Sequence, residues 1–282
     1  MDKLICFQYL KVQTYKTGHS TESALIRVQN DILRAIDGNG CVILLLLDML
    51  AAFDTVDHIT LLARLKERFG IEGTVHNWSR SYLFGRMQFA KIRESRSTSR
   101  PLSCGIPQGS VLGPMLYLLY TAHLGDIMRE HGIFYHKYAD DTQIYMSFSS
   151  SVPGDVEQCQ ARVGACVRDI DRWMLLNNLK LNNDKTELLV LHKSRVQPPI
   201  ECVKVGEFFV VSSNSAKNIG VVFDFAMNLE SHVNDVCNNS FYYIRNIAKI
   251  RCFLNFESKT LINAFVISRI DNCNALLYDL SS

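Results

Sequence analysis

An uninterrupted apolar run that ends at an acid constrains the fold of this chain most. Val42 to Leu47 contains no polar residue, and Asp48 follows it directly. A run of this length, preceded by the break Gly38-Asn39-Gly40, is typical of a strand buried on both faces of a sheet. The end of such a strand is both rigid and open, so Asp48 is a candidate for a functional site.

A second acidic cluster lies in the segment Tyr138-Ala139-Asp140-Asp141. Short apolar, β-prone runs flank the two acids, and this pattern predicts a hairpin with the carboxylate pair at its tip. Two adjacent carboxylates repel each other unless a cation neutralises them, and Mg²⁺ prefers such ligands together with phosphate oxygens. We expect neighbouring strands to bring Asp48 close to Asp140 and Asp141. A solvated turn is the alternative for the pair taken alone.

Three further segments carry weaker signals. The loop Gly105-Ile106-Pro107-Gln108-Gly109-Ser110 precedes an apolar helix expected around 115–124, and its backbone is suited to approach a sugar or phosphate. A strand-to-helix turn capped by Ser110 is the alternative. Lys185 is a point charge for a phosphate, or part of a solvated turn. Asp54 and Asp57 follow the first acid and are better explained as caps or solvated residues before a helix starting near His58.

The rest of the chain alternates between helical and strand patterns, which indicates a mixed α and β protein. We expect helices starting near Ser20 and His58, one carrying Trp78 and Tyr82, a long one over 156–177, and helices again beyond Leu229. Strands are expected over about 87–93, 98–104, 187–192, 202–205, 208–211 and 219–223. The 282 residues are 48% hydrophobic and 21% charged, enough for a sizeable core. A net charge of +2 neither demands nor excludes a nucleic-acid partner.

Cysteine usage and hydropathy bear on the compartment. The nine cysteines form no Cys-x-x-Cys pair, so we expect buried, reduced thiols rather than disulfides or zinc. Met1 to Cys6 has no signal-peptide pattern, and the longest apolar stretch, Cys41 to Leu47, is too short to span a membrane. The expectation is an intracellular protein of the cytoplasm or nucleus, without a membrane partner.

The order of these motifs resembles the reverse transcriptases of non-LTR retrotransposons, the long interspersed elements. Asp48 to Asp57 is similar to the first palm motif of that family, and 105–114 to its Gly-x-Pro-Gln-Gly-Ser motif. Tyr138 to Asp141 is similar to its acidic box, and 181–186 to the lysine-bearing motif that follows. Segments at 15–25, 217–224 and 268–274 resemble further blocks. The resemblance therefore extends over nearly the whole chain.

The resemblance implies an α+β right-hand polymerase fold, with an antiparallel palm sheet and helices, partial fingers and a partial helical thumb. Residues 1–194 would form the fingers and palm core, and 195–282 the end of the palm and part of the thumb. Since the fingers begin abruptly and nothing resembles the endonuclease of a complete element, we expect a fragment.

The family also implies roles for individual residues. Asp48 and Asp140 would bridge two Mg²⁺ ions, with Mn²⁺ as a possible substitute, and Asp141 would complete the acidic site. Phe53 would select dNTP over rNTP by a steric clash with the 2′-OH; a core aromatic is the alternative. Gln108 and Gly109 would line the nascent base pair. Lys185 would lie near the triphosphate and protonate the leaving pyrophosphate.

Three hypotheses for function follow. The first is an RNA-directed DNA polymerase domain that extends a DNA primer on an RNA template with dNTPs. The second is a catalytically inactive nucleic-acid-binding remnant that keeps the fold. The third, a metal-dependent nuclease or phosphatase, needs a residue that activates water, and the spacing of His58, His123 and His136 does not indicate one.

Overall fold

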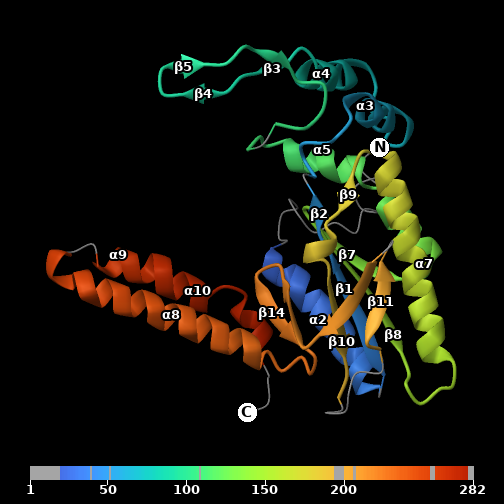
Figure 1. The fold of residues 1–282 in the computed structure, drawn as a ribbon, viewed down its shortest axis with the longest axis vertical. Helices are drawn as coiled ribbons and strands as arrows, with labels where there is room; N and C mark the ends of the chain where they lie inside the picture. The colour runs from blue at the N-terminus through green and yellow to red at the C-terminus, as the bar shows by residue number, and fades with distance from the viewer. Residues whose placement is uncertain are drawn as a thin grey trace.

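A six-stranded sheet forms the centre of the computed structural model, which describes residues 20–38, 40–50, 52–107, 109–193, 200–205, 208–254 and 258–278. The strands lie in the order β11-β12-β10-β1-β8-β7 (Figure 1). Their bounds are β1 Cys41–Leu47, β7 Phe134–Tyr138, β8 Asp141–Phe148, β10 Glu187–Leu191, β11 Cys202–Val205 and β12 Phe208–Ser213.

The predicted apolar strand is β1, and it runs through the middle of this sheet. It pairs antiparallel with β8 on one side and with β10 on the other. Ile43, Leu44 and Leu45 are completely buried, as a strand covered on both faces requires. The only parallel pairing among the described strands of this sheet is between β10 and β12.

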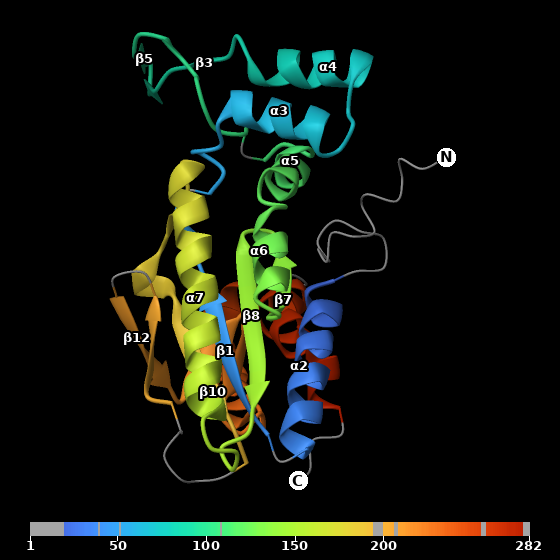
Figure 2. The same cartoon turned by 90° about the vertical axis from the view of Figure 1, so that its right-hand side faces the viewer.

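Helices cover the two faces of the sheet and create two cores. α7, Asp155–Leu176, lies on one face, and α2, Thr21–Asp37, lies on the other (Figure 2). The predicted start of α2 is confirmed by a capping box, in which the side chains of Ser20 and Ser23 each accept a hydrogen bond from the other's backbone amide. Alternate β1 side chains point to the two cores: Ile43 and Leu45 pack on the α7 side, and Val42 and Leu44 on the α2 side.

A helical layer and a long hairpin extend beyond one end of the sheet. The layer consists of α3, His58–Glu67, α4, Gly73–Leu83, and α5, Gly113–Tyr120 (Figure 1). Asp57 caps α3, because its Oδ1 accepts a 2.7 Å hydrogen bond from the amide of Thr60. The hairpin, which we call the fingertip hairpin (residues 86–101), has four two-residue strands: β3 Met87–Gln88, β4 Lys91–Ile92, β5 Ser95–Arg96 and β6 Arg100–Pro101.

Several secondary-structure predictions need correction. The strands expected over about 87–93 and 98–104 are reduced to the two-residue segments β3, β4 and β6. The expected helix over 115–124 ends at Tyr120, and α6, Leu124–Glu130, begins after a turn, so the apolar run is interrupted without a glycine or proline. The strand expected from Ile219 begins at Val221 instead, because Ile219 and Gly220 form a turn with positive φ angles of 44° and 90°. That turn joins β13, Ser215–Asn218, which the sequence did not reveal, to β14, Val221–Asp224.

The last part of the described chain forms a helical arm that projects from the sheet (Figure 1). α8, Glu230–Ile250, leads outward, and a return path follows through a turn of 3₁₀-helix η3 Arg251–Phe253, α9 Ser258–Ile262, π-helix η4 Asn263–Ile267 and α10 Ser268–Ile270. The last described turn of helix, η5 Asn274–Leu277, packs against α2. Among the described residues, no helix is long and apolar enough to cross a membrane.

Candidate active site

The sheet register brings the two predicted acidic clusters to the same edge. Leu47 is opposite Thr142 in an antiparallel pair, so Asp48, the next residue after β1, comes beside Asp141 at the start of β8. Tyr138 pairs with Asp141, which leaves Ala139 and Asp140 as a two-residue hairpin loop. The predicted hairpin is therefore present, and it places Asp140 at the tip and Asp141 on the strand.

The backbone of this loop adopts an uncommon conformation. Ala139 has a φ angle of 55°, a region that side chains other than glycine enter at a cost. Two-residue hairpin loops need a positive φ at their first central residue, because only such turns match the twist of paired strands. The tight loop thus holds Asp140 in a fixed orientation at the end of β7 and β8.

The carboxylates influence one another electrostatically. Loss of hydration, followed by the negative charges of Asp140 and Asp48, together raise the pKa of Asp141 to about 6. Tyr117 lies beneath the site, and burial together with the charges of Asp140 and Asp48 also raises its pKa. The three acids are therefore close enough to oppose one another's ionisation, which a bound cation would relieve.

Asn182 is a site residue that the sequence reasoning did not assign. Its Nδ2 donates a 2.7 Å hydrogen bond to Asp48 Oδ2, and its backbone amide donates a 2.9 Å bond to the Asp48 carbonyl oxygen. Asn182 is buried, and it follows β9, Lys180–Leu181, which pairs with β2, Met49–Leu50. This double contact fixes the Asp48 carboxylate. The sequence signal for Asn182 is its place three residues before Lys185, in the segment Asn182-Asn183-Asp184-Lys185.

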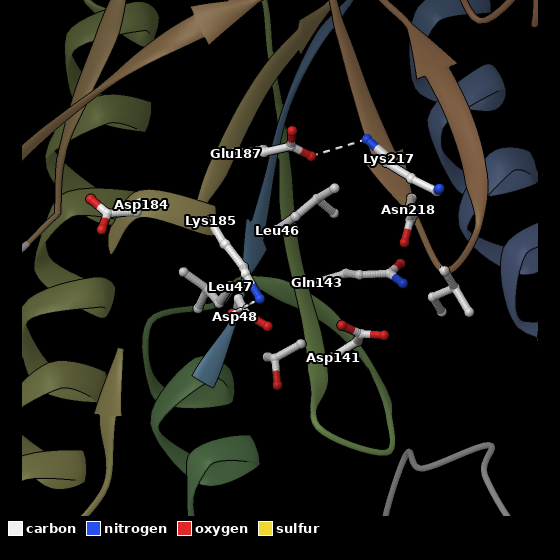
Figure 3. Close-up of a pocket in the computed structure, with 12 residues that line it drawn as sticks. Leu46, Leu47, Asp48, Asp141, Gln143, Asp184, Lys185, Glu187, Lys217 and Asn218 are labelled. Carbon is white, nitrogen blue, oxygen red and sulfur yellow. Dashed lines mark hydrogen bonds and ion pairs between the residues drawn. The ribbon is translucent and has the colours of Figure 1, made fainter. Parts of the chain in front are cut away.

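Lys185 approaches the same carboxylate from the surface. Its Nζ lies 4.0 Å from Asp48 Oδ2, and its side chain is 73% exposed (Figure 3). Lys185 belongs to the 3₁₀ turn η2, Asn183–Lys185. The segment is therefore an exposed turn, and this turn also places the ammonium group beside Asp48. An exposed ion pair of this length contributes little to stability, so the ammonium group is free to turn toward a ligand.

Asp48 and Asp141 line a cleft of about 330 Å³. Asp48, Asp141 and Lys185 lie toward one end, and Gln143, Glu187 and Lys217 line the remainder (Figure 3). At the far end Glu187 accepts a 3.0 Å hydrogen bond from the amide of Lys217 on β13. A cleft with cations beside carboxylates is suited to a ligand that carries both phosphates and metal ions.

The two other predicted substrate-binding segments are only partly described. Phe53 is half-buried and lies with its ring centroid 4.8 Å from that of Tyr117, whose hydroxyl donates a 2.7 Å bond to Met49 Sδ. Phe53 therefore lies in the aromatic layer that supports the acids, although core packing alone also explains it. Gly109 is exposed with a φ angle of 73°, and Gln108 lies outside the described residues.

A buried lysine supports the acidic hairpin from behind. Lys137 on β7 is 2% exposed, and its Nζ donates bonds of 2.7 Å and 3.2 Å to the hydroxyl and carbonyl oxygens of Thr121. Burial lowers the pKa of Lys137 to about 7. The contact attaches strand β7 of the hairpin to the C-terminal end of α5, where the helix dipole favours a cation.

The carboxylate oxygens of the acids fit a hard divalent cation, although the described part of the chain contains no complete set of metal ligands. Asp48, Asp140 and Asp141 offer only carboxylate oxygens, the ligands that Mg²⁺ and Mn²⁺ prefer. No group of three or more His, Cys, Asp or Glu among those residues converges closely enough to hold a metal as it stands. Mg²⁺ commonly takes one or two carboxylates and completes its shell with water and substrate phosphates, so the acids suffice without a cage.

The sheet, the helical layer and the arm correspond to the palm, fingers and thumb of a right-hand polymerase. Two solved structures of Candida tropicalis telomerase share this fold. The apo enzyme gives a TM-score of 0.53 at 13% identity, covering 99% of this chain and 50% of the other. The enzyme in complex with the TWJ fragment of telomeric RNA gives 0.54 at 10% identity, covering 96% and 44%.

The chain belongs to the reverse transcriptase (RNA-dependent DNA polymerase) family, whose model matches residues 9–223. The predicted resemblance to non-LTR retrotransposons is confirmed by relatives from Drosophila melanogaster. The probable RNA-directed DNA polymerase from transposon X-element is 29% identical over 228 residues, and that from transposon BS is 27% identical over 256 residues. These alignments cover 79% and 89% of this chain but 24% and 27% of the relatives, so the chain spans about a quarter of their length.

Proposed function

We propose that this chain is the polymerase core of an RNA-directed DNA polymerase, which adds dNTPs to the 3′-OH of a DNA primer on an RNA template. The observation that carries the proposal is the meeting of Asp48, Asp140 and Asp141 at one edge of the sheet, with the pKa of Asp141 raised to about 6. Family membership supports the same activity, and divalent metal ions are general for this family.

Each residue of the candidate site has a task in this proposal. Asp48, Asp140 and Asp141 would hold two Mg²⁺ ions, or Mn²⁺, which when bound would activate the primer hydroxyl and neutralise the leaving pyrophosphate. Asn182 keeps the Asp48 carboxylate oriented. Lys185, beside Asp48, is placed to contact the triphosphate and supply a proton to pyrophosphate. Phe53 would exclude a 2′-OH, and Gln108 and Gly109 would line the nascent base pair.

The fingertip hairpin and the arm are the proposed nucleic-acid grips. The hairpin carries one aromatic ring, Phe89, and five exposed cations, a combination that suits unstacked bases and phosphates. The cations are Arg86, Lys91, Arg93, Arg96 and Arg100, and Arg96 lies 3.4 Å from the ring centroid of Phe89. The structure of a telomerase bound to RNA supports an RNA partner by fold alone. We also propose residues 1–194 as fingers and palm core, and 195–282 as the end of the palm, with β11 and β12, plus a partial thumb.

Primer extension on an RNA template with Mg²⁺ tests this function. The comparison is between the unchanged chain, Asp140→Ala and the control Glu157→Ala, an exposed acid of α7 that does not line the cleft. We expect incorporation by the unchanged chain and the control, and a loss of at least about a hundredfold in Asp140→Ala, because the metal-held charge is removed. Equal incorporation in all three would overturn the site assignment.

The alternative, a catalytically inactive nucleic-acid-binding remnant, predicts a different pattern. A folded chain that binds an RNA·DNA duplex but incorporates no dNTP, with and without the Asp140→Ala change, would establish it. Mg²⁺-dependent dNTP binding discriminates further, because a polymerase should bind the nucleotide and a remnant whose acidic site has degraded should not.

A further inference from the structure

We infer that His58 is a positioning residue for the nucleotide pocket, which it reaches through the carbonyl group of Gly105. This inference rests on the proposed function, because Phe53 and the loop that begins at Gly105 are there assigned to the incoming nucleotide. His58 is the first residue of α3, it is 2% exposed, and it does not touch the acids' cleft. Its role follows from the contact that it makes.

Two segments far apart in sequence are joined backbone to backbone at this point. The amide of Ile106 donates a 2.8 Å bond to the carbonyl of Phe53, and that of Gly105 donates a 2.8 Å bond to the carbonyl of Val56. A β-bridge between Asp57 and Cys104 continues the pairing. We call this pairing of 53–57 with 104–106 the backbone clip. Because Phe53 and the loop after Gly105 share it, movement of one displaces the other.

Gly105 fits the clip closely and has no room for a side chain. Its φ angle is 88°, and a Cβ atom there would lie 2.9 Å from the carbonyl oxygen of Asp54. The carbonyl of Gly105 therefore has a fixed direction, and it points at the imidazole ring.

The His58 side chain closes the clip. Its Nε2 lies 2.7 Å from the Gly105 carbonyl oxygen in a buried position, and since a carbonyl only accepts, Nε2 carries the proton. The ring also packs against Phe84 at a centroid distance of 5.6 Å. If the imidazole donor is removed, the buried Gly105 carbonyl loses this hydrogen bond. It can bond to water only if the loop after Gly105 turns toward solvent. The expected consequence is a nucleotide pocket that is loosened while the metal-binding acids stay in place.

The test compares three variants in primer extension and in dNTP-to-rNTP discrimination. His58→Leu removes the donor and keeps the volume, His58→Gln restores a donor, and His76→Leu is the matched control. His76 Nε2 bonds the carbonyl of Leu62 at 3.2 Å, the same kind of contact outside the clip. For His58→Leu we expect KM for dNTP to rise roughly tenfold and discrimination against rNTP to fall, with kcat changed less, as loss of one buried hydrogen bond implies. His58→Gln recovers most of both, and His76→Leu leaves both unchanged.

The outcomes separate this inference from the proposed function. Unchanged KM and discrimination in a folded His58→Leu variant would overturn the inference, as would an equal defect in His58→Gln or His76→Leu, which indicates general core damage. If the unchanged chain incorporates nothing, the proposed function fails, and hydrogen exchange then decides the inference. Faster exchange of the Gly105 and Ile106 amides in His58→Leu alone supports the clip, and unchanged exchange rejects it.

Discussion

Asp141 shows how a single residue reports on its neighbours. Its raised pKa means that the folded chain binds this proton more tightly than the unfolded chain does, where the value is near 3.8. Between pH 3.8 and about 6 the folded state therefore holds more protons at this position, and stability from this group is present at low pH and lost as pH rises. At neutral pH Asp141 is ionised, and its charge destabilises the folded state. A bound metal ion would neutralise that charge and restore the stability.

The first prediction concerns the pH dependence of that cost. In metal-free buffer, Asp141→Asn should be more stable than the unchanged chain at pH 7, and the difference should shrink toward zero as pH falls from 6 to 4. Urea unfolding at several pH values measures it, and the comparison cancels other carboxyl groups. Mg²⁺ or Mn²⁺ should raise the unfolding midpoint of the unchanged chain more at pH 7 than at pH 5, because protonated Asp141 binds metal poorly. A pH-independent difference would contradict the assigned pKa.

Lys137 gives the opposite pH dependence. Its pKa is lowered from 10.5 to about 7, so the unfolded chain holds the proton more tightly, and stability from this group rises as pH increases from 7 to about 10. The second prediction is that Lys137→Met gains stability relative to the unchanged chain at pH 6.5, and loses that advantage by pH 9.5. Denaturant midpoints at the two pH values measure it. An advantage that grows with pH would show that the ammonium group is not desolvated.

At the scale of elements, the sequence predicted best where one physical pattern dominated. The uniform apolar run correctly predicted β1, and the acids flanked by β-prone residues correctly predicted the hairpin formed by β7 and β8. β13 was missed because Ser215, Lys217 and Asn218 are polar, and only pairing with β14 makes them a strand. Asn182 was missed as a site residue because its burial and its bond to Asp48 depend on β2 pairing with β9, a contact between distant segments.

The fingertip hairpin carries the third prediction. Arg93, Arg96 and Arg100 are exposed along it, and each phosphate they contact releases a counterion on binding. Replacing all three with serine should weaken binding to an RNA template–primer and reduce the slope of log K against log salt by roughly 0.7 to 0.9 per lost contact. Fluorescence anisotropy at several salt concentrations measures the slope.

The matched control removes the same charge from another element. Arg168 and Arg172 are exposed on α7, and Lys204 is exposed on β11, a strand that packs against that helix. Their joint replacement with serine also lowers the net charge by three, yet it should leave the salt slope nearly unchanged. Equal reductions in both triple variants would show that overall charge, and not the hairpin, determines binding.

At the scale of the whole molecule, the end of the described chain returns to its beginning. η5 packs on α2, where Gln29 Nε2 donates a 3.2 Å bond to the Leu276 carbonyl and the Ala275 amide donates a 2.9 Å bond to Glu22. Leu276 is 1% exposed and belongs to the core on the α2 face of the sheet. Contacts across nearly 250 residues carry no local sequence signal, so this closure could not be predicted from periodicity.

The fourth prediction follows from this closure. Leu276→Ala should lower the free energy of unfolding by about 2 to 4 kcal/mol, because it removes a buried side chain from a packed core. Leu277→Ala, at the half-buried neighbouring position, should cost clearly less. Since β1 contributes side chains to both cores, we expect one cooperative urea transition that moves as a whole, seen alike by tryptophan fluorescence and far-UV circular dichroism. Two separate transitions in Leu276→Ala would show that the α2 core unfolds independently of the core that supports the acids.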